Sequence, residues 1–266
     1  MRTRSVLTAL GLNAVPALGW FVGDWSAGTT LALYWLETLI GTALVAVRIV
    51  LHRRLRPSNG HWHYRASQAK QLQQGMQRSS YLAAYLVPAL AFTLVHGVFL
   101  VALGAIMISN HRTVEARIDL HALSAGVIAI AFFQLVDLGF DLVGLAARPF
   151  AWIERVGNVT FSRVLVTHFT ILIGIAAAMF TGVDRHFFGV FIFLKTLLNV
   201  TAALPQYQPK APPRWLSALM DRVPDRLRKT GGGGTAAGAP GNFAKFWQQS
   251  DEEERRRLAA NEAAVG

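Results

Sequence analysis

The chain has no cysteine, and this absence excludes several kinds of site at once. Without thiols there are no disulfide bonds, no thiolate metal ligands and no cysteine nucleophile. Charged residues are also scarce, because Asp, Glu, Lys and Arg make up only 15% of the 266 residues. A typical soluble domain carries about 25% of such residues. The composition therefore argues against a soluble globular protein.

Motifs of several well-known enzyme classes are missing as well. The sequence contains no HExxH pair of zinc ligands, no glycine-rich phosphate loop followed by lysine and no serine nucleophile elbow. The GGGG run has no lysine directly behind it and no strand before it, so it is expected to be a linker. The sequence leaves open whether the chain is an enzyme.

Long apolar runs are what the sequence has instead. Hydrophobic residues make up 53% of the chain, and they gather into runs of about 20 residues, the length with which a helix crosses a bilayer. In lipid every backbone N–H and C=O must be bonded within its own segment, so such runs predict helices. We expect an all-α, polytopic transmembrane helical bundle with six spans, at residues 5–23, 27–51, 81–108, 121–146, 161–182 and 186–204.

The basic residues predict the orientation of this bundle. The chain has 26 Lys and Arg residues against 15 Asp and Glu residues. Six spans place both termini and the loops 52–80 and 147–160 on one side, where nearly all of the basic residues then lie. Because Lys and Arg are retained in the cytoplasm, we expect a protein of the cytoplasmic (cell) membrane with both termini inside. This placement accounts for the basic charge, so no nucleic-acid partner is expected. The exceptions are Arg112, Arg117 and Arg185 on the opposite side and Lys195 within the sixth span.

Four parts are expected along the chain. They are a six-helix transmembrane domain at 1–204, a basic amphipathic segment at 205–230, a glycine-rich linker at 231–241 and a cytoplasmic tail at 242–266. The basic segment and the basic 52–80 loop predict contact with anionic lipid. A docking site for a protein partner is the alternative for the tail.

Two expectations concern the polar regions. In the tail, Ser250 and Glu253 fit a capping box, which predicts a short helix starting there, with disorder as the alternative. In the 52–80 loop, His61 and His63 lie among basic residues and are expected to be solvated rather than to bind metal.

Polar and ionisable residues inside the predicted spans are the candidate functional residues. A charged side chain near the bilayer centre costs several kcal/mol, so each is expected to face the bundle interior and to find a partner there. The cluster comprises Glu37, His96, Asp137, His168, Lys195 and Asn199, with Asp141 and Arg163 as further candidates for ion pairs.

Three interpretations of this cluster remain open. In the first, a structural one, Glu37 pairs with Lys195, and Asp137 or Asp141 pairs with Arg163, while the histidines bond between helices. The second is a proton- or ion-coupled transport pathway, since His and carboxylate groups can titrate near neutral pH.

The third interpretation is an intramembrane metal-binding enzyme, with hydrolysis as one possible reaction. Glu37, His96 and His168 supply a carboxylate and two imidazoles, which can leave one coordination position open for water. Because no paired-ligand spacing occurs within one span, each ligand has to come from a different helix.

A family resemblance rests on several of these segments. The second span contains YWLE, ending at Glu37, the third contains the pair His96–Gly97, the fifth reads RVLVTHFTILIG and the sixth contains FLKTLLNV. Over residues 15–204 the chain resembles an uncharacterised family of bacterial and archaeal multi-pass membrane proteins. The resemblance implies membrane placement and singles out Glu37, His96, His168 and Lys195. It implies no activity.

Overall fold

The computed structural model describes residues 2–67, 80–181, 192–193, 195–197, 211–220 and 243–264, and places their side chains except for 2–9, 166–181 and 244. In these ranges the regular structure is helical throughout. The long helices are α1 (Arg2–Phe21), α2 (Ala27–Leu55), α4 (Tyr81–Ser109), α6 (Leu120–Leu142) and α7 (Phe150–Thr181). Shorter elements are η1 (Asn59–His61), α5 (Thr113–Ala116), η2 (Leu145–Ala147), α9 (Arg214–Met220) and α11 (Phe243–Glu262).

Within the described residues, three stretches are long and apolar enough to cross a membrane. They are α2, α4 and the stretch Thr113–Leu142, which contains α5 and α6. Helices α2, α4 and α6 start and end within four residues of the bounds predicted from the apolar runs, whereas the stretch that contains α6 begins earlier, at Thr113. Helix α1 contains a shorter apolar stretch, Leu10–Phe21. Of the predicted sixth span, only residues 192–193 and 195–197 lie within the described part of the chain.

The start of α7 differs from the sequence prediction. Residues 147–160 were expected to form a loop, but α7 begins at Phe150 and is 32 residues long. Its first turns contain the charged residues Glu154 and Arg155, and the apolar run in the sequence begins only at about residue 161. The polar first turns are stabilised by contacts with α11, a segment far away in the sequence.

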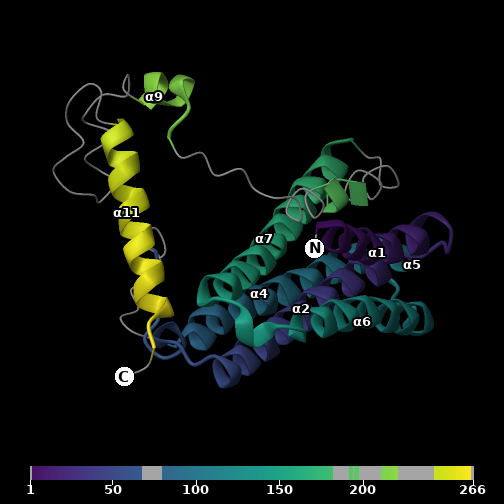
Figure 1. The fold of residues 1–266 in the computed structure, drawn as a ribbon. Coiled ribbons are helices and arrows are strands. Elements are labelled where there is room, and N and C mark those ends of the chain that lie inside the picture. Colours follow the sequence, from purple (N-terminus) through teal and green to yellow (C-terminus); the bar gives the residue numbers. More distant parts are fainter. Residues whose placement is uncertain are drawn as a thin grey trace.

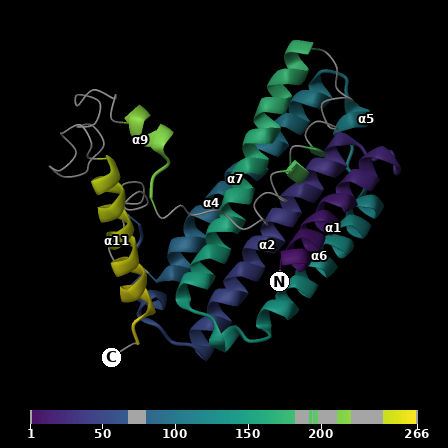
Figure 2. The ribbon, with the colours of Figure 1, turned by 45° about the horizontal axis from the view of Figure 1, so that its top comes forward.

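Helix α2 is the centre of the bundle. It packs against α1, α4, α6 and α7, and Figure 2 shows it running between these neighbours. Its N-terminus is capped by Ser26, whose side chain accepts a hydrogen bond from the N–H of Thr29. Close approach to the α5–α6 connection requires Gly28 here, because a Cβ would lie within 3 Å of the carbonyl of Ala116.

Large apolar side chains on α4 and α6 point away from the bundle. Val98 and Val101 on α4 are 71% and 75% exposed, and Ile128 on α6 is 70% exposed. Contiguous apolar surface of this kind is rare on soluble monomers and is expected where lipid surrounds a helix. These faces are therefore compatible with contact to a bilayer.

A buried aromatic cluster closes one end of the bundle. It contains Tyr64 from the loop after α2, Tyr81 and Tyr85 from α4 and Phe150 from α7. The ring centroids of Tyr64 and Tyr81 are 4.9 Å apart, and Phe150 meets Tyr81 edge-on at 5.4 Å. This packing holds the loop that follows α2 against the starts of α4 and α7.

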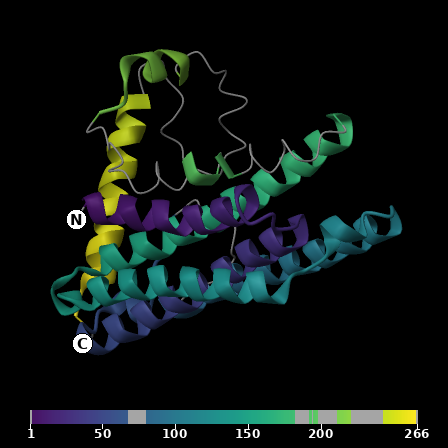
Figure 3. The ribbon, with the colours of Figure 1, turned by 90° about the vertical axis from the view of Figure 1, so that its right-hand side faces the viewer.

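Helix α11 lies crosswise at this same end. Figure 3 shows it running across the direction of the long helices, and Figure 1 shows its C-terminal end near η1 and the start of α7. It begins at Phe243, several residues before the predicted capping box at Ser250, which instead lies inside the helix. The aromatic residues before Ser250 extend the helix, so the box does not mark its start.

Candidate functional site

Glu37 and Lys195 form a buried ion pair, as the sequence predicts for its structural interpretation. Lys195 Nζ donates a hydrogen bond to Glu37 Oε2 over 2.6 Å. The same ammonium group lies 3.6 Å from the centroid of the Tyr34 ring, one turn earlier on α2. Lys195 is only 3% exposed. Its charge is therefore balanced by a carboxylate and by the face of an aromatic ring.

A second buried cation, Arg48, bridges α2 and α6. Its Nε lies 3.0 Å from Asp141 Oδ2, and its Nη2 lies 3.2 Å from Asp137 Oδ2. The two aspartates are four residues apart, so they share one face of α6. Arg48 is 5% exposed, and its guanidinium group thus holds two carboxylates of one neighbouring helix.

Arg48 was not among the candidates singled out from the sequence. Arg163 was expected to pair with Asp137 or Asp141, and Arg48 was counted only as a basic residue near the end of a span. The overlooked signal is helical spacing, since Arg48 follows Glu37 by about three turns and so lies on the same face of α2. That face was already expected to point inward.

Arg163 lies between the two pairs. Both Glu37 and Asp137 act electrostatically on its guanidinium group. Its Nε is buried and has no hydrogen-bond partner among the described residues. The arrangement along the bundle is therefore Lys195 with Glu37, then Arg163, then Asp137 and Asp141 with Arg48.

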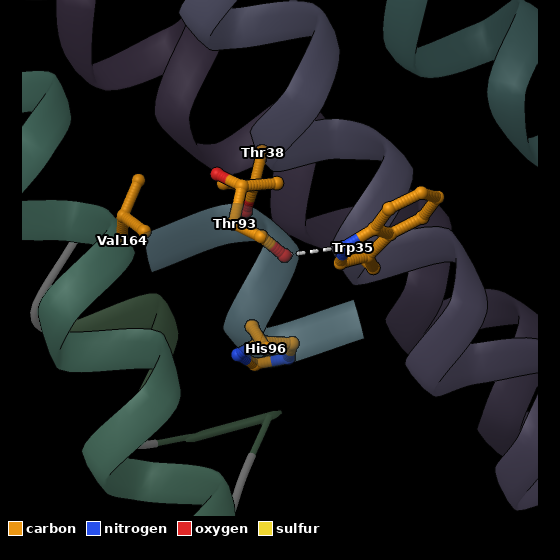
Figure 4. A pocket seen from close by; sticks show the side chains of 5 residues that line it. All are labelled: Trp35, Thr38, Thr93, His96 and Val164. Carbon is orange, nitrogen blue, oxygen red and sulfur yellow. Dashed lines mark hydrogen bonds between the residues drawn. The ribbon is translucent and has the colours of Figure 1, made fainter. Parts of the chain in front are cut away.

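His96 lines a small cavity between α2, α4 and α7. The cavity has room for about one water molecule. Figure 4 shows the indole of Trp35 donating to the backbone carbonyl of Thr93 beside it, over 2.9 Å. The five residues that line the cavity do not include Glu37 or Lys195. They are Trp35, Thr38, Thr93, His96 and Val164.

Two residues of the predicted polar cluster are not described with their side chains. The side chain of His168 and the whole of Asn199 lie outside the described residues. Within the part of the chain that the structure describes, no group of three His, Asp or Glu side chains is arranged to hold a metal ion. A metal site made of Glu37, His96 and His168 therefore stays a prediction.

A buried histidine pair was missed by the sequence analysis. His61 was expected to be solvated but is 1% exposed, and its Nε2 lies 2.8 Å from Nδ1 of His52, at the end of α2. His52 Nε2 lies 3.0 Å from the carbonyl oxygen of Arg148. Because a carbonyl only accepts, His52 carries a proton on Nε2. When both rings are neutral, His61 Nε2 then donates to His52 Nδ1.

Burial explains why this pair stays neutral. Desolvation lowers the pKa of His61 to about 4, assisted by repulsion from the protonated form of His52 and from Arg53. Its ring packs edge-on against Phe150, with centroids 5.0 Å apart. His63 by contrast is exposed, as expected. His61 is buried because η1 turns it back toward the helix ends.

Glu154 is the centre of a polar network between α7 and α11. Its carboxylate accepts a hydrogen bond from the Tyr64 hydroxyl over 2.5 Å and pairs with Arg257 at 2.9 Å. Glu154 is 5% exposed. Burial, and next the charge of Glu154, raise the pKa of the Tyr64 phenol above its ordinary range. Tyr64 therefore stays a hydrogen-bond donor.

The last turns of α11 add backbone contacts to this network. Asn261 is fully buried, accepts from the N–H of Arg65 and donates to its carbonyl, over 2.9 and 3.0 Å. The N–H of Asn59 donates to the carbonyl of Ala263 over 2.7 Å. Glu262 pairs with Arg56. The tail is thus fixed to the end of the bundle by specific bonds.

The chain belongs to a protein family described as Family of unknown function (DUF6498), whose model matches residues 1–214. The match contains the helices α1 to α7 and ends at the first residue of α9, so α11 lies beyond it. The expected membership of an uncharacterised family is thereby confirmed. No curated protein and no solved structure matches the chain.

Proposed function

We propose that this chain is a six-span helical protein of the cytoplasmic membrane, with both termini inside, in which the buried charges serve to hold the helices together. In this role the protein is a structural or scaffold subunit, and its charged cluster is not a route for a substrate. The lipid bilayer is its principal partner. The buried ion pairs around α2 are the site on which the proposal rests.

The distribution of charge along the helices supports the orientation. Arg53, Arg54 and Arg56 lie at the C-terminal end of α2, and Arg148 lies between α6 and α7 at the same end of the bundle. Positive charge at this end is expected on the cytoplasmic side. These residues, the rest of the basic 52–80 loop and the basic segment around α9 are also where anionic lipid is expected to bind.

The single observation that carries the structural role is the direct pairing of Lys195 with Glu37. A hydrogen bond of 2.6 Å and an aromatic face leave the ammonium group without access to water. A residue that carries protons or ions has to exchange them with water or with a neighbour. Removing one partner of such a buried pair typically costs about 3 to 5 kcal/mol, so the pair has a large structural effect.

A double-mutant cycle tests this role. We expect Glu37→Gln and Lys195→Met each to lower the thermal midpoint of the protein in detergent. The double variant is expected to recover much of the loss, because it leaves no buried charge without a partner. The exposed pair of Glu252 and Arg256 on α11 is the matched control, with little change in any variant. Independent, additive losses from Glu37 and Lys195 would contradict the proposal.

A proton- or ion-coupled pathway is the second candidate, and one observation favours it. Glu37, Arg48 and His52 follow one another along one face of α2, from its middle to its end, each with an ionisable partner. Proton flux into liposomes measures this activity. Flux that is present in the native protein and absent from Glu37→Gln and His96→Ala variants would favour the pathway over the structural role.

A further inference from the structure

The contacts that fix α11 come from one half of the helix. Arg257, Asn261 and Glu262 supply the bonds to the loop after α2 and to the start of α7. From there the helix extends away from the long helices toward α9, as Figures 1 and 2 both show. The half of α11 that begins at Phe243 therefore projects beyond the bundle.

The projecting half carries an aromatic cluster. The ring of Phe243 stacks on that of Phe246 with centroids 6.4 Å apart, and it meets Trp247 at 6.1 Å. Phe246 is 53% exposed. The neighbouring helix α9 adds Trp215, which is 69% exposed. Large aromatic side chains are thus presented to the surroundings beside the bundle.

These aromatic residues share a face with the residues that bind the bundle. At 100° per residue, Phe243, Trp247, Arg257 and Asn261 lie within one stripe along α11. The stripe faces the bundle at its C-terminal half, so it faces the same direction at its N-terminal half. Beyond the edge of the bundle, the stripe therefore faces whatever medium surrounds the long helices.

The opposite face of α11 is charged and exposed. Glu252 and Arg256 lie on it, are both exposed and form an ion pair of 3.6 Å. One side of the helix is thus charged and the other is aromatic where it leaves the bundle. This division is typical of a helix that lies in a membrane interface.

The depth of α11 fits such an interface. Its last turns bind Arg56, the residue after α2, and Phe150, the first residue of α7, so it lies level with the ends of two long helices. Nearby, the guanidinium of Arg148 lies 4.3 Å above the ring of Trp152. Tryptophan and arginine are enriched at headgroup depth, where one end of the side chain is apolar and the other wet.

We infer that the aromatic face formed by Phe243, Phe246 and Trp247 is a membrane-binding surface that inserts among the lipid headgroups of the cytoplasmic leaflet. The crosswise orientation of α11 lays the helix along the bilayer plane, with the Glu252–Arg256 face toward water. Because the exposed residues of this face are aromatic, binding does not require anionic lipid. The inference rests on the proposed membrane placement of the long helices.

The absence of cysteine makes a site-specific test straightforward. A single cysteine is introduced in the full chain as Phe246→Cys, Arg256→Cys or Val98→Cys and labelled with an environment-sensitive fluorophore. The labelled proteins are reconstituted into phosphatidylcholine vesicles. Quenching by spin-labelled phosphatidylcholine and by aqueous iodide is then compared among the three positions.

We expect lipid quenching at position 246 to exceed that at position 256 by about threefold or more, with the reverse order for iodide. Adding Trp247→Ser is expected to shift position 246 toward iodide quenching and to leave position 256 unchanged. Equal iodide quenching at 246 and 256 would overturn the inference. Shielding of position 246 from both quenchers would also overturn it, in favour of packing against protein.

Val98, on the exposed face of α4, distinguishes a failure of the inference about α11 from a failure of the proposed membrane placement. If its label is quenched by lipid and the label at 246 is not, the inference about α11 fails while the membrane placement stands. If the label at Val98 is not quenched by lipid, the proposed membrane placement itself fails.

Discussion

The carboxylate of Glu262 accepts a hydrogen bond from the backbone N–H of Phe150, the first residue of α7. The first N–H groups of a helix have no partner within the helix, and a carboxylate there also interacts favourably with the helix dipole. Glu262, in the last turn of α11, thus caps the N-terminus of α7. Its second oxygen binds Arg56, so one side chain joins α11, α7 and the end of α2.

Replacing this cap is expected to weaken the end of the bundle at which α7 begins. Glu262→Gln removes the charge at the helix N-terminus and the ion pair with Arg56, so we expect a loss of about 1 to 2 kcal/mol of unfolding free energy. Hydrogen exchange at the first turn of α7 measures the effect, and protection there is expected to fall. Glu252→Gln, on the exposed face of α11, serves as the control and is expected to change nothing at α7.

Arg48 is expected to be the most sensitive basic residue of α2. Arg48→Met leaves Asp137 and Asp141 without their shared partner, which predicts a loss of roughly 3 to 5 kcal/mol. Arg54→Met, on the exposed surface of the same helix, is the matched control and is expected to be nearly neutral. Thermal midpoints in detergent measure both variants. Equal midpoints for the two variants would show that the buried pairs contribute nothing to stability.

The buried histidine pair predicts a loss of stability in acid. The folded-state pKa of His61 is about 4, below its ordinary value of 6.5, so the unfolded chain binds the proton more readily. The contribution of neutral His61 is therefore complete above about pH 6.5 and is lost as the pH falls from there toward 4, by at most about 3 kcal/mol.

Thermal midpoints measured across this pH range test the histidine prediction. His61→Gln is expected to flatten the dependence, whereas His63→Gln, in the same loop but exposed, is expected to leave it unchanged. A His61→Gln variant with the full native slope would assign the acid sensitivity to other groups.

Two helical glycines provide a matched pair for testing the packing. A Cβ at Gly157 on α7 would clash with the hydroxyl of buried Tyr81, so Gly157→Ala is expected to cost about 1 to 3 kcal/mol. Around Gly139 on α6 no atom of the described residues comes within 4 Å of such a Cβ. Gly139→Ala is therefore expected to be neutral or stabilising by up to about 1 kcal/mol. Thermal midpoints of the two variants decide this.

Much of the helical architecture could be predicted because the positions of the apolar runs determine where the long helices lie. The bounds of α2, α4 and α6 follow from where apolar residues begin and end. The Glu37–Lys195 pair was also predictable, since a carboxylate and an ammonium group in the middle of two apolar runs have to neutralise each other. These are features that the residues of a segment decide largely by themselves.

The remaining features depend on contacts between distant segments. The early start of α7 is stabilised by Glu262, which lies 112 residues beyond Phe150. The burial of His61 depends on the rings of Phe150 and His52, so its basic neighbours gave a misleading expectation. Arg48 was misjudged because an arginine near the end of a span can reach either water or the interior, and only the position of α6 decides between them.

The pairing of Glu37 with Lys195 has a consequence for biogenesis. Glu37 leaves the ribosome 158 residues before Lys195, so its carboxylate still lacks this cation when α2 has been synthesised. A charge at the centre of a nascent span opposes its release into lipid. If the long helices span a membrane as proposed, α2 is therefore expected to stay beside the translocation channel until the later segments have been synthesised.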